Sequence, residues 1–394
     1  MKITDVRTTM VAVPLAMSGR FEPVTMWYET RYANNDCITY IDTDEGITGV
    51  GVQGDQHTIM NIMRPKLIGR DPFDIEAVEK GLGDNIRGRW HWDTKSMAAI
   101  DNALWDIIGK AAGLPLYKLW GGKVNDPINV RYWIDCRSVE EQVEEALRGK
   151  ERGWKSFKIK LGTGPKEDLE RVRAIRKAVG DDVELCFDLN GGYPMHVAIN
   201  TFKKMADYNI SCIEDPVPCF WPYDAGALEC MADIRRITGI PIAAHSHGPN
   251  CLEYVMELVR KRAADMLHLN VSYVGSILEC KRLCAVAEAG GLIVTGQSTC
   301  AELGPRNALL LHLITSERAF KGTNDSSTHH LEPPARDIIK NEFRTVNGTL
   351  KVPEGPGLGV ELDEERVAEF SALYEKAEHR DGPGIGRGDP HLWF

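Results

Sequence analysis

The feature that most constrains this sequence is a regular alternation of strand and helix patterns that begins near residue 126. Between the strands lie helix signals: Ser138 with Glu141 predicts a capping box, and Pro165 predicts a first helical turn. The spacing of the strands, roughly 25 to 30 residues, is that of one βα unit. The eight strands are expected to begin near Ile128, Ser156, Val183, Ser211, Ile240, Asp265, Leu292 and Ala319.

Eight such units in succession predict an α/β fold, a closed parallel (β/α) barrel of the TIM type. An open, doubly wound sheet is the alternative. Such a sheet would carry a phosphate-binding G-x-G-x-x-G motif directly after its first strand, and no such motif follows the strand that begins near Ile128.

The segments that flank the alternation have other patterns. Residues 3–14, 36–43 and 47–52 read as antiparallel strands, and an apolar stripe predicts a helix over about residues 95–112. Beyond the barrel, Asn347-Gly348 predicts a hairpin turn between Thr345 and Val352. We therefore divide the chain into residues 1–125, 126–345 and 346–394.

Charge and composition exclude several classes of protein. The 394 residues include 47 basic and 57 acidic side chains, a net charge of −10, which argues against a nucleic-acid partner or a polybasic membrane anchor. No apolar run reaches the roughly 18 residues of a membrane span, and the N-terminus lacks a signal-peptide pattern. The ten cysteines form no C-x-x-C pair. We expect reduced thiols in a cytoplasmic protein with no membrane partner.

Polar residues end four successive strands of the expected barrel, where catalytic groups of such barrels lie. Lys158 and Lys160 share one face of the second strand because side chains alternate with period two. Asp188 and Glu214 end the next two strands at one level, and they repel each other unless a cation lies between them. Oxygen ligands suit Mg²⁺, and His245 on the fifth strand is the candidate third ligand.

Each of these residues also has an ordinary structural explanation. A Lys-x-Lys pair is usually a solvated strand edge, and an aspartate at a strand end is often a turn or helix cap. A histidine at a barrel rim is more often structural than a ligand. The functional interpretation is favoured because four successive strands deliver suitable residues at the same end.

Several short motifs occur along the whole chain: Asp44-Glu45-Gly46-Ile47-Thr48-Gly49, Ala103-Leu104-Trp105-Asp106, Leu114–Leu119 with Gly121-Gly122, Lys158-Ile159-Lys160, Asp188-Leu189-Asn190, Glu214-Asp215-Pro216 and Val352-Pro353 through Gly359. Taken together, these motifs resemble the enolase superfamily in its mandelate racemase and muconate-lactonizing branch. The resemblance implies a modified (β/α) barrel under an α+β capping domain, which residues 1–125 begin and residues 346–394 complete. It also implies removal of a proton α to a substrate carboxylate by Lys160, with Mg²⁺ held by Asp188, Glu214 and a group on strand five.

The sequence departs from the family pattern at three strands. Strand five offers His245 in place of a carboxylate, strand six offers Asn270 in place of a second lysine, and strand seven leads into Gln297 and Ser298 in place of a histidine. The second base of a racemase is therefore missing. Loss of a β-hydroxyl after one-sided proton abstraction fits better, which is dehydration of a sugar acid (an aldonate or aldarate) to a 2-keto-3-deoxy acid.

The acid-sugar dehydratases that resemble this sequence include a galactarate dehydratase type with histidine as third ligand. The alternatives are a racemase, epimerase or cycloisomerase of the same superfamily, and a catalytically silent barrel that binds a carboxylate. Lys158 is a like charge beside Lys160 and is expected to favour its neutral form. We expect a homo-oligomer that acts on a small carboxylate. The candidate substrate-binding residues are Tyr28, Arg20, Arg89, Trp90, Asn190, His247, Asn270, Gln297 and His330.

Overall fold

The first part of the chain forms a small antiparallel sheet. The computed structural model describes residues 1–377 except 18, 84–92, 220–224, 247–250 and 299–301. Strands β1 (Ile3–Pro14), β6 (Ala33–Thr43) and β7 (Thr48–Val52) pair in the order β1-β6-β7. The smaller elements are β2 (Ala16–Met17), β3 (Arg20–Phe21), β4 (Val24–Met26), β5 (Glu29–Arg31), a π-helical turn (Thr58–Met63), α1 (Arg64–Leu67), α2 (Ile75–Gly83) and α4 (Leu116–Leu119).

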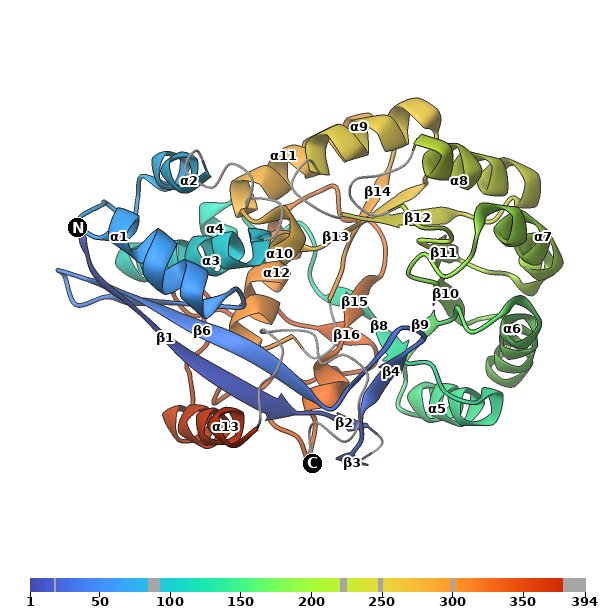
Figure 1. The fold of residues 1–394 in the computed structure, drawn as a ribbon, viewed down its shortest axis with the longest axis horizontal. Coiled ribbons are helices and arrows are strands. Elements are labelled where there is room, and N and C mark those ends of the chain that lie inside the picture. The colour runs from blue at the N-terminus through green and yellow to red at the C-terminus, as the bar shows by residue number, and fades with distance from the viewer. Residues whose placement is uncertain (18, 84–92, 220–224, 247–250, 299–301, 378–394) are drawn as a thin grey trace.

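Two helices cover this sheet, one from the N-terminal region and one from the C-terminal segment. Helix α3 (Thr94–Ala112) packs so closely on β7 that a Cβ at Gly51 would clash with the carbonyl oxygen of Ala99. Helix α13 (Glu364–Lys376) lies along β1 (Figure 1) and buries Val367 and Phe370 in a cluster with Val11. The C-terminal segment therefore returns to the N-terminal sheet.

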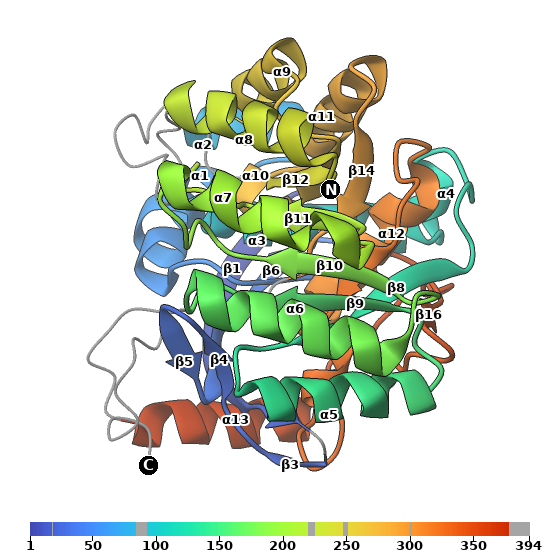
Figure 2. The same cartoon turned by 90° about the vertical axis from the view of Figure 1, so that its right-hand side faces the viewer.

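The middle of the chain is a nearly closed parallel barrel. Its strands follow the chain order around the ring, and helices α5 to α9 lie side by side outside them (Figure 2). The strands are β8 (Ile128–Ile134), β9 (Ser156–Lys160), β10 (Glu184–Asp188), β11 (Cys212–Glu214), β12 (Ile242–His245), β13 (Met266–Leu269), β14 (Ile293–Gly296) and β15 (Asn324–Ser326). The helices are α5 (Val139–Glu151), α6 (Pro165–Val179), α7 (Met195–Met205), α8 (Ala225–Thr238), α9 (Cys251–Lys261), α10 (Val271–Val274), α11 (Ile277–Ala289) and α12 (Gly304–Ser316), with 3₁₀ turns at Ala206–Tyr208 and Thr328–Leu331.

The expected start of the eighth strand is wrong. Near Ala319, only Phe320 makes an isolated parallel bridge to Val294, and the strand that pairs with β8 begins at Asn324. The ring closes through backbone hydrogen bonds between Val294 and residues 319–321 and through the Gly296 amide, which donates to Oδ1 of Asn324 at 2.7 Å. The strand itself, Asn324-Asp325-Ser326, has polar residues throughout, so no apolar pattern marks where it begins.

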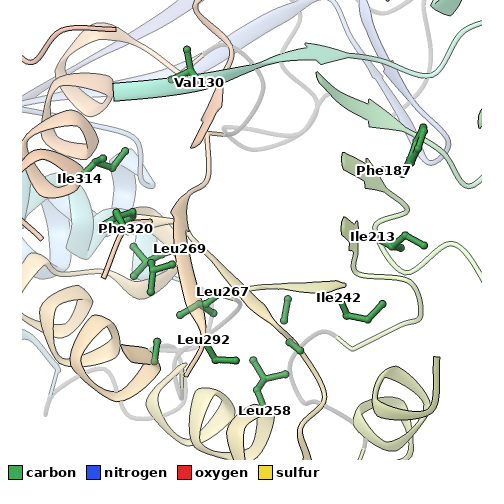
Figure 3. Close-up of a cluster of buried hydrophobic side chains, with 14 of the residues drawn as sticks. Val130, Phe187, Ile213, Ile242, Leu258, Leu267, Leu269, Leu292, Ile314 and Phe320 are labelled. Atoms are coloured by element: carbon green, nitrogen blue, oxygen red, sulfur yellow. The ribbon is translucent and has the colours of Figure 1, made fainter. Parts of the chain in front are cut away.

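Alternation along the barrel strands separates packing from chemistry. Phe187, Ile213 and Ile242 point toward the surrounding helices and pack in one large apolar core, shown in part in Figure 3. Their neighbours Cys186 and Cys212 belong to a separate small cluster inside the ring. The side chains between the core positions therefore face the barrel interior.

Other local expectations can be compared directly with the structure. The Ser138–Glu141 capping box is present, and Pro165 opens α6. Asn347 and Gly348 form the expected turn with positive φ, but β16 (Thr349–Leu350) pairs with β8. Among the described residues, no helix is long and apolar enough to cross a membrane.

Candidate active site

The predicted catalytic residues meet at the carboxyl end of the barrel strands. Asp188 is paired in register with Lys160 on one side and with Glu214 on the other. Lys158, two residues earlier, points to the same side of β9. All four side chains are at most 6% exposed, so their charges must be balanced by nearby charged groups.

The two lysines have different surroundings. Nζ of Lys158 lies 2.6 Å from Oε2 of Glu214, 2.7 Å from Oδ2 of Asp325 and 3.2 Å from Oδ2 of Asp188. Burial by itself lowers the pKa of Lys158, but these three carboxylates raise it well above its usual value. Lys158 is therefore a fixed positive charge, and its charge is compensated by anions.

Nζ of Lys160 lies nearer the mouth of the barrel. It donates to Oδ2 of Asp188 at 2.6 Å and to Oδ1 of Asn190 at 2.7 Å, and it lies 5.3 Å from the ring centre of Trp133. Asn190 adopts positive φ, and its backbone N–H donates to the other oxygen of Asp188, Oδ1, at 2.9 Å. Two acceptors and an aromatic ring thus orient this amine.

The surroundings shift the pKa values of Asp188 and Glu214 in opposite directions. Burial and the nearby charge of Glu214 raise the pKa of Asp188, although the lysines partly offset this. Burial also acts to raise the pKa of Glu214, but His268 and Lys158 hold it well below its usual range. Glu214 is therefore ionised near neutral pH, and it draws cations to this end of the barrel.

His245 lies further along its strand than the carboxylates. Ala243 pairs with Glu214, so His245 is two residues beyond that level. Its ring stands edge-on to Tyr273, with ring centres 5.2 Å apart, and its amide donates to Asp215 at 3.1 Å. The structure thus brings Asp188 and Glu214 together and places His245 above them.

Two compact groups of potential metal ligands differ from the predicted trio. Across the described part of the chain, ligand atoms of three such residues come within 4.8 Å of one another in two sets. One set is Glu214, His268 and Asp325, and the other is Cys186, Cys212 and His268. Neither contains Asp188 or His245.

The carboxylate oxygens of Asp188 and Glu214 are suitable ligands for magnesium. Both are buried, they face each other in register, and hard carboxylate oxygens suit this ion. Their oxygens already converge on the ammonium of Lys158, which marks a position where positive charge is stabilised. The residues present therefore fit the metal.

The sequence analysis missed the buried charged residues around Lys158 and Glu214. His268 contacts Glu214 at 2.7 Å, and Arg131 lies 3.3 Å from Asp325 and 3.2 Å from Glu184. Although burial lowers the pKa of His268, Glu214 and Cys212 raise it to about 10. The alternation Leu267-His268-Leu269 already indicates that His268 points inward.

Amides occupy the opposite side of the barrel mouth. Strands β9 and β13 are separated by three strands in the ring of eight, so they face each other across the barrel. Asn270, just after β13, donates to the side chain of Gln297 and accepts from Nη2 of Arg306 at 2.5 Å. Arg306, which is buried, also pairs with Glu302 at 2.6 Å.

A segment of the N-terminal region lies over β9 and β10. The indole of Trp27 donates to the carbonyl of Leu189 at 2.7 Å, and a Cβ at Gly162 would clash with the same ring. Tyr28, with its ring 5.2 Å from that of Trp27, is 47% exposed. Burial and Glu29 raise the pKa of its hydroxyl group, and the charge of Asp188 adds to this rise.

The other residues predicted to bind substrate do not gather at the barrel mouth in the described part of the chain. Arg20 pairs with Glu22, and its side chain is 72% exposed, so the structure leaves it at the surface. His330 is fully buried with its ring 5.1 Å from that of Trp133, and burial holds its pKa well below the usual value. Arg89, Trp90 and His247 lie outside the described residues.

Two family models match the chain over these regions. The model "Mandelate racemase / muconate lactonizing enzyme, N-terminal domain" covers residues 6–121, and "Enolase C-terminal domain-like" covers residues 139–366. The chain belongs to the enolase superfamily. Within it, the chain falls in the mandelate racemase and muconate-lactonizing branch, and it is an enzyme of this superfamily.

The relatives differ in the reactions they perform. An N-succinyl-L-Arg/Lys racemase from Bacillus cereus is 28% identical over 95% of this chain and 99% of its own. An arabinonate dehydratase from Saccharolobus solfataricus is 29% identical over 82% of this chain and 86% of its own. A structure from Thermobispora bispora described as an enolase in complex with magnesium and formate has a TM-score of 0.83 at 24% identity, covering 97% of this chain and 95% of its own. Isomerases and lyases are thus similarly close.

Proposed function

We propose that the enzyme is a magnesium-dependent dehydratase of a sugar acid, an aldonate or aldarate. The observation that carries the proposal is the asymmetry of the barrel mouth. Lys160 offers an oriented amine on one side, and the Asn270–Gln297 amide pair occupies the other. Amides do not accept a proton near neutral pH, so these two strand ends supply no second base.

The ligands proposed for the metal are Asp188 and Glu214, with His245 as the third. Bound there, magnesium would supply positive charge where the substrate carboxylate becomes more negative as the α-proton leaves. Lys158 adds a fixed positive charge beside the same position because it is held protonated by its carboxylate partners.

Proton transfer is assigned to Nζ of Lys160. Asp188 and Asn190 orient the amine, and Trp133 restricts it from a third direction. After accepting the α-proton, Lys160 can return a proton to the β-hydroxyl that leaves on the same side. The products are water and an enol, which becomes the 2-keto-3-deoxy acid.

A panel of aldonates and aldarates tests the proposal when each is incubated with the enzyme and Mg²⁺. Formation of a 2-keto-3-deoxy acid supports it. Exchange of the α-proton in D₂O with inversion and without loss of water identifies an epimerase or racemase instead, the activity to which the Bacillus cereus relative points. Tight binding of an acid with neither exchange nor product identifies a silent binding barrel.

A further inference from the structure

The ammonium of Lys158 occupies the place where three carboxylates converge. Its nearest oxygens belong to Glu214 at 2.6 Å, Asp325 at 2.7 Å and Asp188 at 3.2 Å. Two of these three residues are the ligands proposed for magnesium. An ammonium ion and a divalent ion therefore compete for the same oxygens.

When magnesium binds, the ammonium of Lys158 cannot move into solvent. Its side chain is completely buried on β9, inside the ring of strands. An unpaired ammonium in such surroundings is strongly unfavourable, so Lys158 needs a carboxylate whether or not a metal is bound. Of its three partners, Asp325 is the one that the proposed metal site does not use.

Asp325 is well placed to hold the lysine. Its Oδ2 accepts from Nζ of Lys158 at 2.7 Å, while its Oδ1 faces Nη1 of Arg131 at 3.3 Å. Each carboxylate oxygen thus has its own cation. Arg131 is fixed in turn by Glu184 at 3.2 Å and by the pairing of its own backbone with Asp325 across β8 and β15.

We propose that Asp325 is a positioning residue that retains the ammonium of Lys158 and so leaves the oxygens of Asp188 and Glu214 to the magnesium ion. The inference rests on the proposed function, because it uses the metal site assigned there. In the Asp325→Asn variant, Lys158 would depend on Asp188 and Glu214 alone. The affinity for magnesium would then fall through competition by the enzyme's own lysine.

The test measures magnesium binding without substrate, by calorimetric titration of the full chain. We expect the Mg²⁺ dissociation constant of Asp325→Asn to rise by about tenfold or more. Glu184→Gln is the matched control, since it removes a carboxylate partner of Arg131 but none of Lys158. The magnesium affinity of Glu184→Gln should stay within about twofold of the wild-type value. Asp325→Glu keeps the negative charge and should retain most of the wild-type affinity.

A double-mutant cycle separates this mechanism from simple loss of negative charge near the metal. In a Lys158→Gln background the competitor is gone, so adding Asp325→Asn should change the dissociation constant little. An equal loss of affinity in both backgrounds overturns the inference, as does wild-type affinity in Asp325→Asn. If Asp325→Asn does not fold, Lys158→Gln alone decides: it should bind magnesium at least as tightly as wild type, and weaker binding overturns the inference. A wild-type protein that binds no magnesium refutes the metal site itself, a different failure.

Discussion

Replacing Lys160 by methionine should abolish turnover while the fold and the metal site persist. Methionine keeps the buried stem of the side chain and removes only the amine. In the structure that amine touches Asp188 and Asn190 and lies over Trp133, and no other amine reaches both acceptors in the described residues. The variant therefore removes the proposed proton acceptor without opening a large cavity.

The size of the effect follows from the role assigned to the amine. A positioned general base contributes about 10² to 10⁴ in rate, or about 3 to 5 kcal/mol of transition-state stabilisation. Magnesium affinity should not fall, because the change removes a cation that now lies 2.6 Å from Oδ2 of Asp188. We thus expect kcat to drop by at least two orders of magnitude with magnesium binding equal or tighter.

The assay combines turnover, exchange of the α-proton in D₂O followed by NMR, and magnesium titration. Lys155→Met makes the same chemical change at an exposed lysine of the preceding turn and should leave all three unchanged. Lys160→Arg keeps the positive charge but cannot accept the proton, so it should be as inactive as Lys160→Met. Turnover within tenfold of wild type in Lys160→Met would refute the assignment of the base.

Three further changes probe the fold and the covering segment. Phe187→Ala should reduce the free energy of unfolding by about 3 to 5 kcal/mol in a urea titration, because this side chain is fully buried among barrel and helix residues; a loss below 1 kcal/mol would contradict that packing. Trp27→Ala should raise KM more than it lowers kcat, since it removes the indole that is bonded to Leu189 beside the strand ends; an unchanged KM would show that Trp27 does not shape the site. Burial lowers the pKa of His312 from 6.5 to about 4, so the unfolded chain binds more protons between these values and stability falls as the pH drops from 6.5 toward 4. Relative to His312→Asn, the wild type should lose up to about 3 kcal/mol over this range, and parallel stability curves for the two proteins would contradict the shift.

The barrel and its strand ends were predictable because the signals are local. The alternation in Phe157-Lys158-Ile159-Lys160 puts both lysines inside the ring, and the equivalent positions of Asp188 and Glu214 follow from the spacing of parallel strands. These features depend only on the period of a strand and the order of strands around a barrel.

Features set by contacts between distant segments were not predictable in the same way. The sequence places Lys158 two residues from Lys160 and suggests a like-charge pair, but the structure surrounds Lys158 with carboxylates from three other strands. Asp325 lies on a short polar strand with no apolar alternation to reveal it. Arg20 is close to Tyr28 in the sequence, yet it pairs with Glu22 at the surface.

Along each barrel strand, inward-facing and outward-facing side chains alternate, and the two sets have different roles. Outward residues such as Ile159 and Phe187 pack in the core between the strands and the helices, and inward ones such as Lys160 and Asp188 form the proposed site. A change at an inward position at the mouth can alter the reaction without disturbing the shell that supports it. Such a separation of roles would explain how a racemase and a dehydratase can each be less than one-third identical to this chain and still match most of its length.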